Sequence, residues 1–123
     1  PTNPTVTSRD INNAIEIAKN NDYDTIISVY KYSGIHPAVM YKKQNDENFE
    51  PILPDNSELP RQKFQNIYAR SGLFYLISTK ILKQKKSIYG KKIHAIEMNK
   101  ERAIPIDSEE DFYLAEQYLK TVL

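Results

Sequence analysis

The most constraining feature of this sequence is a helical pattern followed at once by a run of β-branched residues. Thr7 and Asp10 have the spacing of a capping box, and apolar residues then recur from Ile11 at i, i+3, i+4 and i+7, which predicts an amphipathic helix over about 8–20. Residues 25–29 are nearly all apolar, as in a strand buried on both faces. A helix followed by such a strand is half of a βαβ unit. The sequence therefore predicts an α/β fold.

The remaining elements are predicted from shorter patterns. Strands are expected at 39–42, 71–77 and 93–98, loops at 30–37 and 45–55, a short basic helix at 79–85, and no regular element over 59–70. Ser108 and Asp111 form a second capping box, which opens a final helix. The apolar residues expected to share one face of that helix are Phe112, Ala115, Tyr118, Leu119 and Val122.

Composition excludes several classes of protein. The chain has no cysteine and two histidines, which excludes a disulfide framework, a thiol nucleophile and a thiolate or histidine-rich zinc site. The formal net charge of +1 predicts no bulk field that recruits nucleic acid or an anionic membrane. The apolar runs are far shorter than the roughly 20 residues that span a bilayer. We therefore expect a soluble, cytoplasmic protein without nucleic-acid or membrane partners.

Two arginines form the first candidate site. Arg61 and Arg70 flank a loop, and Gly72 lets the backbone approach a ligand closely. Guanidinium groups in this arrangement suit the bidentate binding of a carboxylate or phosphate. The alternative is that both arginines are solvated surface residues.

Asp107 and the two histidines are further candidates. Asp107 lies just outside the start of the final helix, where it is either a hard oxygen ligand for Mg²⁺ or a structural residue. His36 is either a general base or a plain hydrogen-bonding loop residue. His94 alternates with apolar neighbours and is expected to be a sheet-surface or packing residue. Residue chemistry alone thus indicates an α/β domain with a possible anion and Mg²⁺ site.

Six short motifs occur in a fixed order along the chain. They are Pro1-Thr2-Asn3-Pro4, His36-Pro37, Pro60-Arg61-Gln62, Arg70-Ser71-Gly72-Leu73-Phe74-Tyr75, Tyr89-Gly90-Lys91-Lys92, and the segment from Glu101 through Asp107 to Glu116. In this order and with these gaps, the chain resembles the C-terminal part of the acylneuraminate cytidylyltransferases, the CMP-sialic acid synthetase family. Members of that family join CTP to a nine-carbon 2-keto sugar acid and release pyrophosphate.

The resemblance implies a fold, an assembly and residue roles. The fold would be part of a nucleotide-diphospho-sugar transferase-like, Rossmann-like three-layer α/β/α domain spanning 1–123, working as a homodimer. The segment of about residues 60–92 would contribute to the sugar-binding side of the site and to the dimer contact. Arg61 would hold the carboxylate of the sugar acid, while Gln62, Arg70 and Tyr75 would line the sugar side or the dimer contact. Asp107 would be one of the acidic Mg²⁺ ligands.

Departures from the family pattern limit these implications. Pro105 replaces the first of two aspartates, Ser71 replaces an asparagine, and a lysine that some members carry after His-Pro is absent. The family's CTP-binding loop, rich in Arg, Gly, Ser and Lys, is absent too, and the three glycines present lack a phosphate-binding spacing. We therefore expect the chain to be a fragment that neither binds CTP nor turns over alone. Two alternatives stay open: a non-catalytic dimerisation or binding module of the same fold, and a related 3-deoxy-octulosonate or pseudaminate cytidylyltransferase.

Overall fold

The computed structural model describes residues 2–54 and 58–122, which form two compact units. The first unit contains residues up to Tyr30 together with those from Ala69 onward, and the second contains residues 31–68. None of the helices in the described part of the chain is long and apolar enough to cross a membrane.

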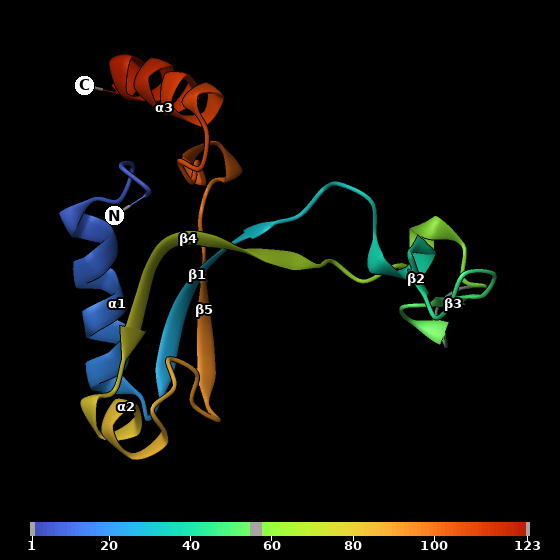
Figure 1. The fold of residues 1–123 in the computed structure, drawn as a ribbon. Coiled ribbons are helices and arrows are strands. Elements are labelled where there is room, and N and C mark those ends of the chain that lie inside the picture. Colours follow the sequence, from blue (N-terminus) through green and yellow to red (C-terminus); the bar gives the residue numbers. More distant parts are fainter. Residues whose placement is uncertain (1, 55–57, 123) are drawn as a thin grey trace. The chain divides into compact units, whose positions relative to one another are not determined.

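The first unit is built on a mixed three-stranded sheet in the order β4-β1-β5 (Figure 1). The strands are β1 (Thr25–Lys31), β4 (Tyr68–Ile77) and β5 (Ile93–Glu97), and the helices are α1 (Ser8–Asn20), α2 (Thr79–Lys85) and α3 (Glu109–Val122). β1 and β5 are parallel, with Thr25 opposite Ile93 and Val29 opposite Glu97. Helices packed around a sheet with parallel strands confirm the predicted α/β class.

The helix α1 has the predicted bounds because its capping box forms. The Thr7 hydroxyl accepts from the backbone N–H of Asp10 at 3.3 Å, and the Asp10 carboxylate accepts from the N–H of Thr7 at 2.8 Å. The helix turns its small residue Ala14, 1% exposed, toward the sheet. The buried core contains Ala14, Ile26, Leu73, Phe74 and Met98.

The central strand β1 is buried as predicted, whereas β5 is buried on one face only. Ile26 and Val29 of β1 are 1% and 6% exposed. In β5, His94 and Ile96 are half-buried, whereas the alternating positions Ile93, Ala95 and Glu97 are exposed. His94 stacks on the ring of Tyr23 with centroids 4.7 Å apart, which confirms its predicted packing role.

The strand β4 bends sharply within its length (Figure 1), and it contains Gly72. Gly72 has φ +70°, in the left-handed region that favours glycine. Alternation of the side chains breaks there, since Ser71 and Leu73 are buried and Phe74 is buried as well. The hydroxyl of Ser28, on β1, bonds both the N–H and the C=O of Phe74 at 3.1 Å. A buried side chain thus satisfies the backbone beside the bend.

The second unit holds a short antiparallel hairpin of β2 (Tyr41–Lys43) and β3 (Phe49–Pro51). The Asn45 side chain shapes the turn by accepting from the N–H groups of Glu47 and Asn48 at 3.1 and 3.0 Å. Two 3₁₀ turns, Pro37–Val39 and Arg61–Lys63, complete the described part of this unit.

Several predicted boundaries are wrong. The strand expected at 39–42 begins at Tyr41, because His36 and Pro37 start a 3₁₀ turn that includes Val39. The expected loop at 45–55 contains β3, while its last residue, Asp55, lies outside the described residues. The expected loop at 30–37 begins only after Lys31, and the strand expected at 71–77 already begins at Tyr68.

The final helix forms behind its capping box, but its predicted apolar face is only partly buried. The Ser108 hydroxyl accepts from the N–H of Asp111 at 3.2 Å, and the Asp111 carboxylate accepts from the N–H of Ser108 at 2.9 Å. Ala115 is 2% exposed, whereas Phe112 and Val122, at the two ends of the helix, are 63% and 56% exposed. α3 therefore contacts the rest of its unit through its middle.

Candidate functional site

The edge of the sheet where β1 and β5 end is the first place to look for a site. In open α/β sheets, ligands bind outside the carboxyl ends of the parallel strands. Here an open hollow of about 780 Å³ lies between the first turns of α1 and the residues that follow β5. The polar residues among its lining are Ser8, Arg9, Asp10, Asn12, Asn13, Glu16, Glu97, Asn99 and Arg102.

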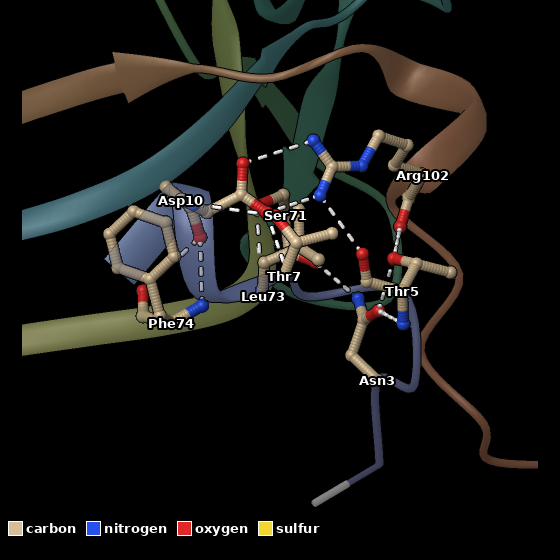
Figure 2. A network of polar contacts seen from close by, with 9 residues as sticks. Asn3, Thr5, Thr7, Asp10, Ser71, Leu73, Phe74 and Arg102 are labelled. Atoms are coloured by element: carbon tan, nitrogen blue, oxygen red, sulfur yellow. Dashed lines mark hydrogen bonds and ion pairs between the residues drawn. The ribbon is translucent and has the colours of Figure 1, made fainter. Parts of the chain in front are cut away.

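Asp10 and Arg102 both line this hollow, and they form an ion pair (Figure 2). Nη1 of Arg102 donates to Asp10 Oδ1 at 3.1 Å. Nη2 pairs with Asp10 Oδ2 and also donates to the C=O of Thr5 at 2.9 Å. Burial raises the pKa of Asp10, but the hydrogen bonds from Arg102 and Thr7 more than offset this and lower it to about 2. The same pairing raises the pKa of Arg102. Both groups therefore stay charged, and the pair is a fixed structural link with no proton to exchange.

The N-terminal segment joins the same network. The Asn3 amide donates to the C=O of Ser71 at 3.2 Å, and the Thr5 hydroxyl lies 2.8 Å from Asn3 Oδ1 and also contacts the C=O of Arg102 (Figure 2). Asn3 and Thr5 are only 6% and 4% exposed. Within the described residues, every buried side-chain nitrogen or oxygen has a hydrogen-bond partner. The network thus holds the start of the chain against β4 and the residues after β5.

Asp107 lies further along the same edge, just before α3. Its backbone N–H donates to the Asp111 carboxylate at 3.1 Å. The hydrogen bonds from the Ser108 side chain, then from the backbone of Asp107, lower the pKa of Asp111, which serves as a cap. The Asp107 side chain is exposed and takes no part in that cap. Among the described residues, those that line the hollow do not include Asp107, so the two are separate features of this edge.

A metal site formed by this chain alone is not present in the described part of the structure. No three Asp, Glu or His side chains of residues 2–54 and 58–122 lie close enough together to hold one ion. Magnesium, however, is commonly bound through one or two carboxylates, with the remaining positions filled by substrate phosphates and water. The exposed carboxylate of Asp107 fits the role of a single protein ligand in such a site.

Arg70 and Tyr75 come together around Tyr89, which sequence reasoning did not single out as a site residue. Arg70 bonds the Tyr89 hydroxyl, and its guanidinium carbon lies 5.6 Å from the centre of the Tyr89 ring. The Tyr75 ring meets Tyr89 edge-on, with centroids 6.4 Å apart. The bend at Gly72 explains the grouping, because it breaks the alternation between Arg70 and Tyr75. The only signal in the sequence was the Tyr89-Gly90 motif.

Arg61 and Gln62 belong to the second unit, where both are exposed on the 3₁₀ turn. Arg61 lines a hollow of about 400 Å³ with Ser33, Gly34, Ile35, His36 and Phe64. A guanidinium over such a hollow suits an anion. Because Arg70 belongs to the first unit, the two-arginine clamp stays a prediction.

His36 is a structural residue of that hollow. Its Nδ1 accepts from the N–H of Ala38 at 3.1 Å, its Nε2 lies 3.1 Å from the C=O of Gln65, and its ring stacks on Phe64 at 4.6 Å. Both ring nitrogens are therefore engaged by the backbone. This confirms the hydrogen-bonding role and leaves no free nitrogen for a general base.

Comparison with known proteins adds no family to these observations. No protein-family model matches the sequence, and no curated protein matches it either.

Proposed function

We propose that this chain is part of a cytidylyltransferase that joins CTP to a nine-carbon 2-keto sugar acid, giving the CMP-sugar and pyrophosphate. The observation that carries the proposal is the position of Asp107. Asp107 follows β5 in the chain and its carboxylate is exposed. The carboxylate that caps α3 is that of Asp111, so the Asp107 carboxylate remains available. Open α/β sheets bind ligands outside the carboxyl ends of their parallel strands, and Asp107 is on the segment that leads from the end of β5 to α3. The finer fold, a Rossmann-like three-layer domain acting as a homodimer, is part of the same proposal.

The arginines divide the work of binding the sugar acid. Arg61, exposed over its hollow, would receive the carboxylate through a bidentate pair of hydrogen bonds. Arg70 and Tyr75, together with Gln62, would line the sugar side or the dimer contact. Arg70 is suited to this because Tyr89 already holds its guanidinium, so little conformational entropy is lost when a ligand binds.

Asp107 would hold Mg²⁺ together with the phosphates of CTP. When bound, the metal would neutralise charge that develops as the sugar hydroxyl attacks the α-phosphorus. Pro105 stands where the resembled family carries a second aspartate, so Asp107 would act as the one carboxylate of this segment. Positioning of the two substrates would supply most of the remaining rate acceleration.

A second candidate is a non-catalytic binding or dimerisation module of the same fold. The observation that favours it is the replacement at Pro105, since no three-member group of metal-binding side chains exists among the described residues. A related 3-deoxy-octulosonate or pseudaminate enzyme is the third candidate, and it differs from the first only in the sugar acid.

The test is pyrophosphate release by the full-length gene product with CTP, Mg²⁺ and each of several sugar acids. We expect pyrophosphate release with a nine-carbon acid. Asp107→Asn should lower kcat/KM at least about 100-fold. Arg61→Lys should raise the KM for the sugar acid, because lysine keeps the positive charge but not the two-pronged guanidinium. Glu110→Gln and Lys63→Gln are the matched controls, because each removes a charge of the same sign nearby. Absence of release from a folded protein would favour the module, and release only with 3-deoxy-octulosonate would favour the third candidate.

A further inference from the structure

Charge is strongly segregated along this chain. Residues 59–96 contain nine lysines and arginines and no aspartate or glutamate. Because the whole chain has a formal net charge of +1, the remaining residues have a net charge of −8. The near-neutral total therefore conceals a basic and an acidic part, and it does not describe the field near either one.

Six lysines of the basic part gather at one end of the first unit. Lys80, Lys83, Lys85, Lys86, Lys91 and Lys92, named the basic platform below, are all exposed on α2 and on the loop that precedes β5. This is the end where β1 and β5 begin (Figure 1). Lys92 pairs with Asp22 at 2.5 Å, and Lys85 lies in the field of Asp24. The other four have no carboxylate within ion-pair distance among the residues that the structure describes.

The loop of the platform is held by Asp24 and Thr25. The Asp24 carboxylate accepts from the N–H groups of Lys91 and Lys92 at 2.6 and 3.1 Å, and these bonds, Lys92 first, lower its pKa. The Thr25 hydroxyl, in a residue only 1% exposed, accepts from the N–H of Gly90 at 3.0 Å and donates to the C=O of Ile88 at 3.1 Å. Lys91 and Lys92 are thus presented from a preorganised backbone, which reduces the entropy lost on binding.

Exposed aliphatic side chains lie among these lysines along the chain. Leu82, Ile88 and Ile93 are 44%, 41% and 45% exposed. Proteins usually bind nucleic acids through aromatic side chains that stack on the bases and through arginine forks. Aliphatic side chains and lysines supply neither contact. Lysines mixed with exposed aliphatic residues instead suit the interface of an anionic bilayer, where ammonium groups meet lipid phosphates and aliphatic groups enter the headgroup boundary.

We propose that the basic platform docks the protein on the surface of an anionic lipid membrane. The opposite end of the unit supports one orientation, because Glu97 ends β5, Glu101, Glu109 and Glu110 follow it, and all four are exposed. A negative surface repels that end and attracts the platform. The edge of the sheet that carries Asp107 therefore faces away from the membrane. This inference is independent of the proposed function.

Vesicle co-sedimentation of the full-length gene product tests the proposal. We expect binding to phosphatidylglycerol-containing vesicles that weakens with added salt, and little binding to pure phosphatidylcholine vesicles. The triple variant Lys80→Gln, Lys83→Gln and Lys91→Gln should lower the partition coefficient about 100-fold, since each lysine near an anionic surface contributes about a fivefold factor. The matched control Lys31→Gln, Lys63→Gln and Lys120→Gln removes the same charge from exposed positions outside the platform and should bind as the wild type does.

Two further measurements separate a membrane from other polyanions. Leu82→Gln with Ile88→Gln should weaken vesicle binding several-fold while the far-ultraviolet circular dichroism spectrum stays unchanged. A single-stranded oligonucleotide should compete weakly with the vesicles. Three results would each overturn the proposal. The first is an equal loss of vesicle binding in the two lysine variants, and the second is equal binding to neutral and anionic vesicles. The third is full displacement of the protein by the oligonucleotide together with no effect of the aliphatic substitutions.

Discussion

The substitution Asp10→Asn tests the link between the N-terminal segment and the residues after β5. The pKa of Asp10 falls from 3.8 to about 2 in the folded protein, chiefly because the bonds from Arg102 and Thr7 outweigh burial. A shift of this size corresponds to about 2.5 kcal/mol of stability at neutral pH. The Asp10 and Arg102 side chains are only 12% and 20% exposed, so solvent screens this pair little.

The sign of the pH dependence follows from the lowered pKa. Because the folded protein binds the proton less tightly than the unfolded chain does, the stabilisation is complete above about pH 5 and is lost as the pH falls toward 2. Asp10→Asn should therefore reduce the free energy of unfolding by at least about 2.5 kcal/mol at pH 7, since it also leaves Arg102 without its counter-charge. The difference between wild type and variant should shrink to under about 1 kcal/mol near pH 2.

Urea unfolding followed by the amide NMR signals of β1 measures the first unit by itself. A carboxyl-carbon NMR titration of Asp10 gives its pKa directly. Glu116→Gln is the control, because Glu116 is an exposed carboxylate of the same unit with a solvent-screened partner, Lys120, at 3.2 Å. A difference between wild type and Asp10→Asn that stays constant from pH 7 to pH 2, or an Asp10 pKa near 4, would refute the reasoning.

Two further predictions concern the backbone of the first unit. Ser28→Ala should cost about 1–3 kcal/mol, because it leaves the N–H and C=O of Phe74 without the buried hydroxyl that bonds both; a loss below about 0.5 kcal/mol in urea unfolding would contradict this. Gly90→Ala should destabilise more than Gly72→Ala, since a Cβ at Gly90 would lie 2.0 Å from that of Asp24, whereas one at Gly72 meets nothing within 4 Å and costs only about 1 kcal/mol for the positive φ. A lower melting temperature for Gly72→Ala than for Gly90→Ala would contradict this, and it would show that the loop before β5 can shift to accommodate the extra methyl group.

The helices were predictable because their signals are local. The capping boxes at Thr7 and Ser108 fix the start of α1 and α3 within three residues of sequence, so no tertiary information is needed. The strand β3 was missed for the opposite reason. Only Phe49 of its three residues favours a strand, whereas Glu50 and Pro51 do not, and the three become a strand by pairing with β2 across the turn that Asn45 shapes.

The candidate site was predictable only in part. That Asp111 caps α3 while the Asp107 side chain lies outside the cap followed from position relative to the helix start, which is again local. The pairing of Asp10 with Arg102 joins residues 92 positions apart, and no sequence pattern connects them. The grouping of Arg70, Tyr75 and Tyr89 depends on the bend at Gly72, because regular alternation would send Arg70 and Tyr75 to opposite faces.

The strand order β4-β1-β5 also constrains how the protein is made. Both neighbours of β1 follow it in the chain, β4 first and β5 last, and the partner of Thr25 is Ile93. β1 therefore leaves the ribosome with both edges unpaired, and its edge toward β5 is paired last. At typical rates of translation, the roughly 70 intervening residues take about 3–14 s to synthesise. During that time the apolar edge of β1 is open to pairing with other nascent chains. Slow synthesis or crowded polysomes should therefore lower the yield of folded protein, and a chaperone that covers residues 25–31 during translation should restore it.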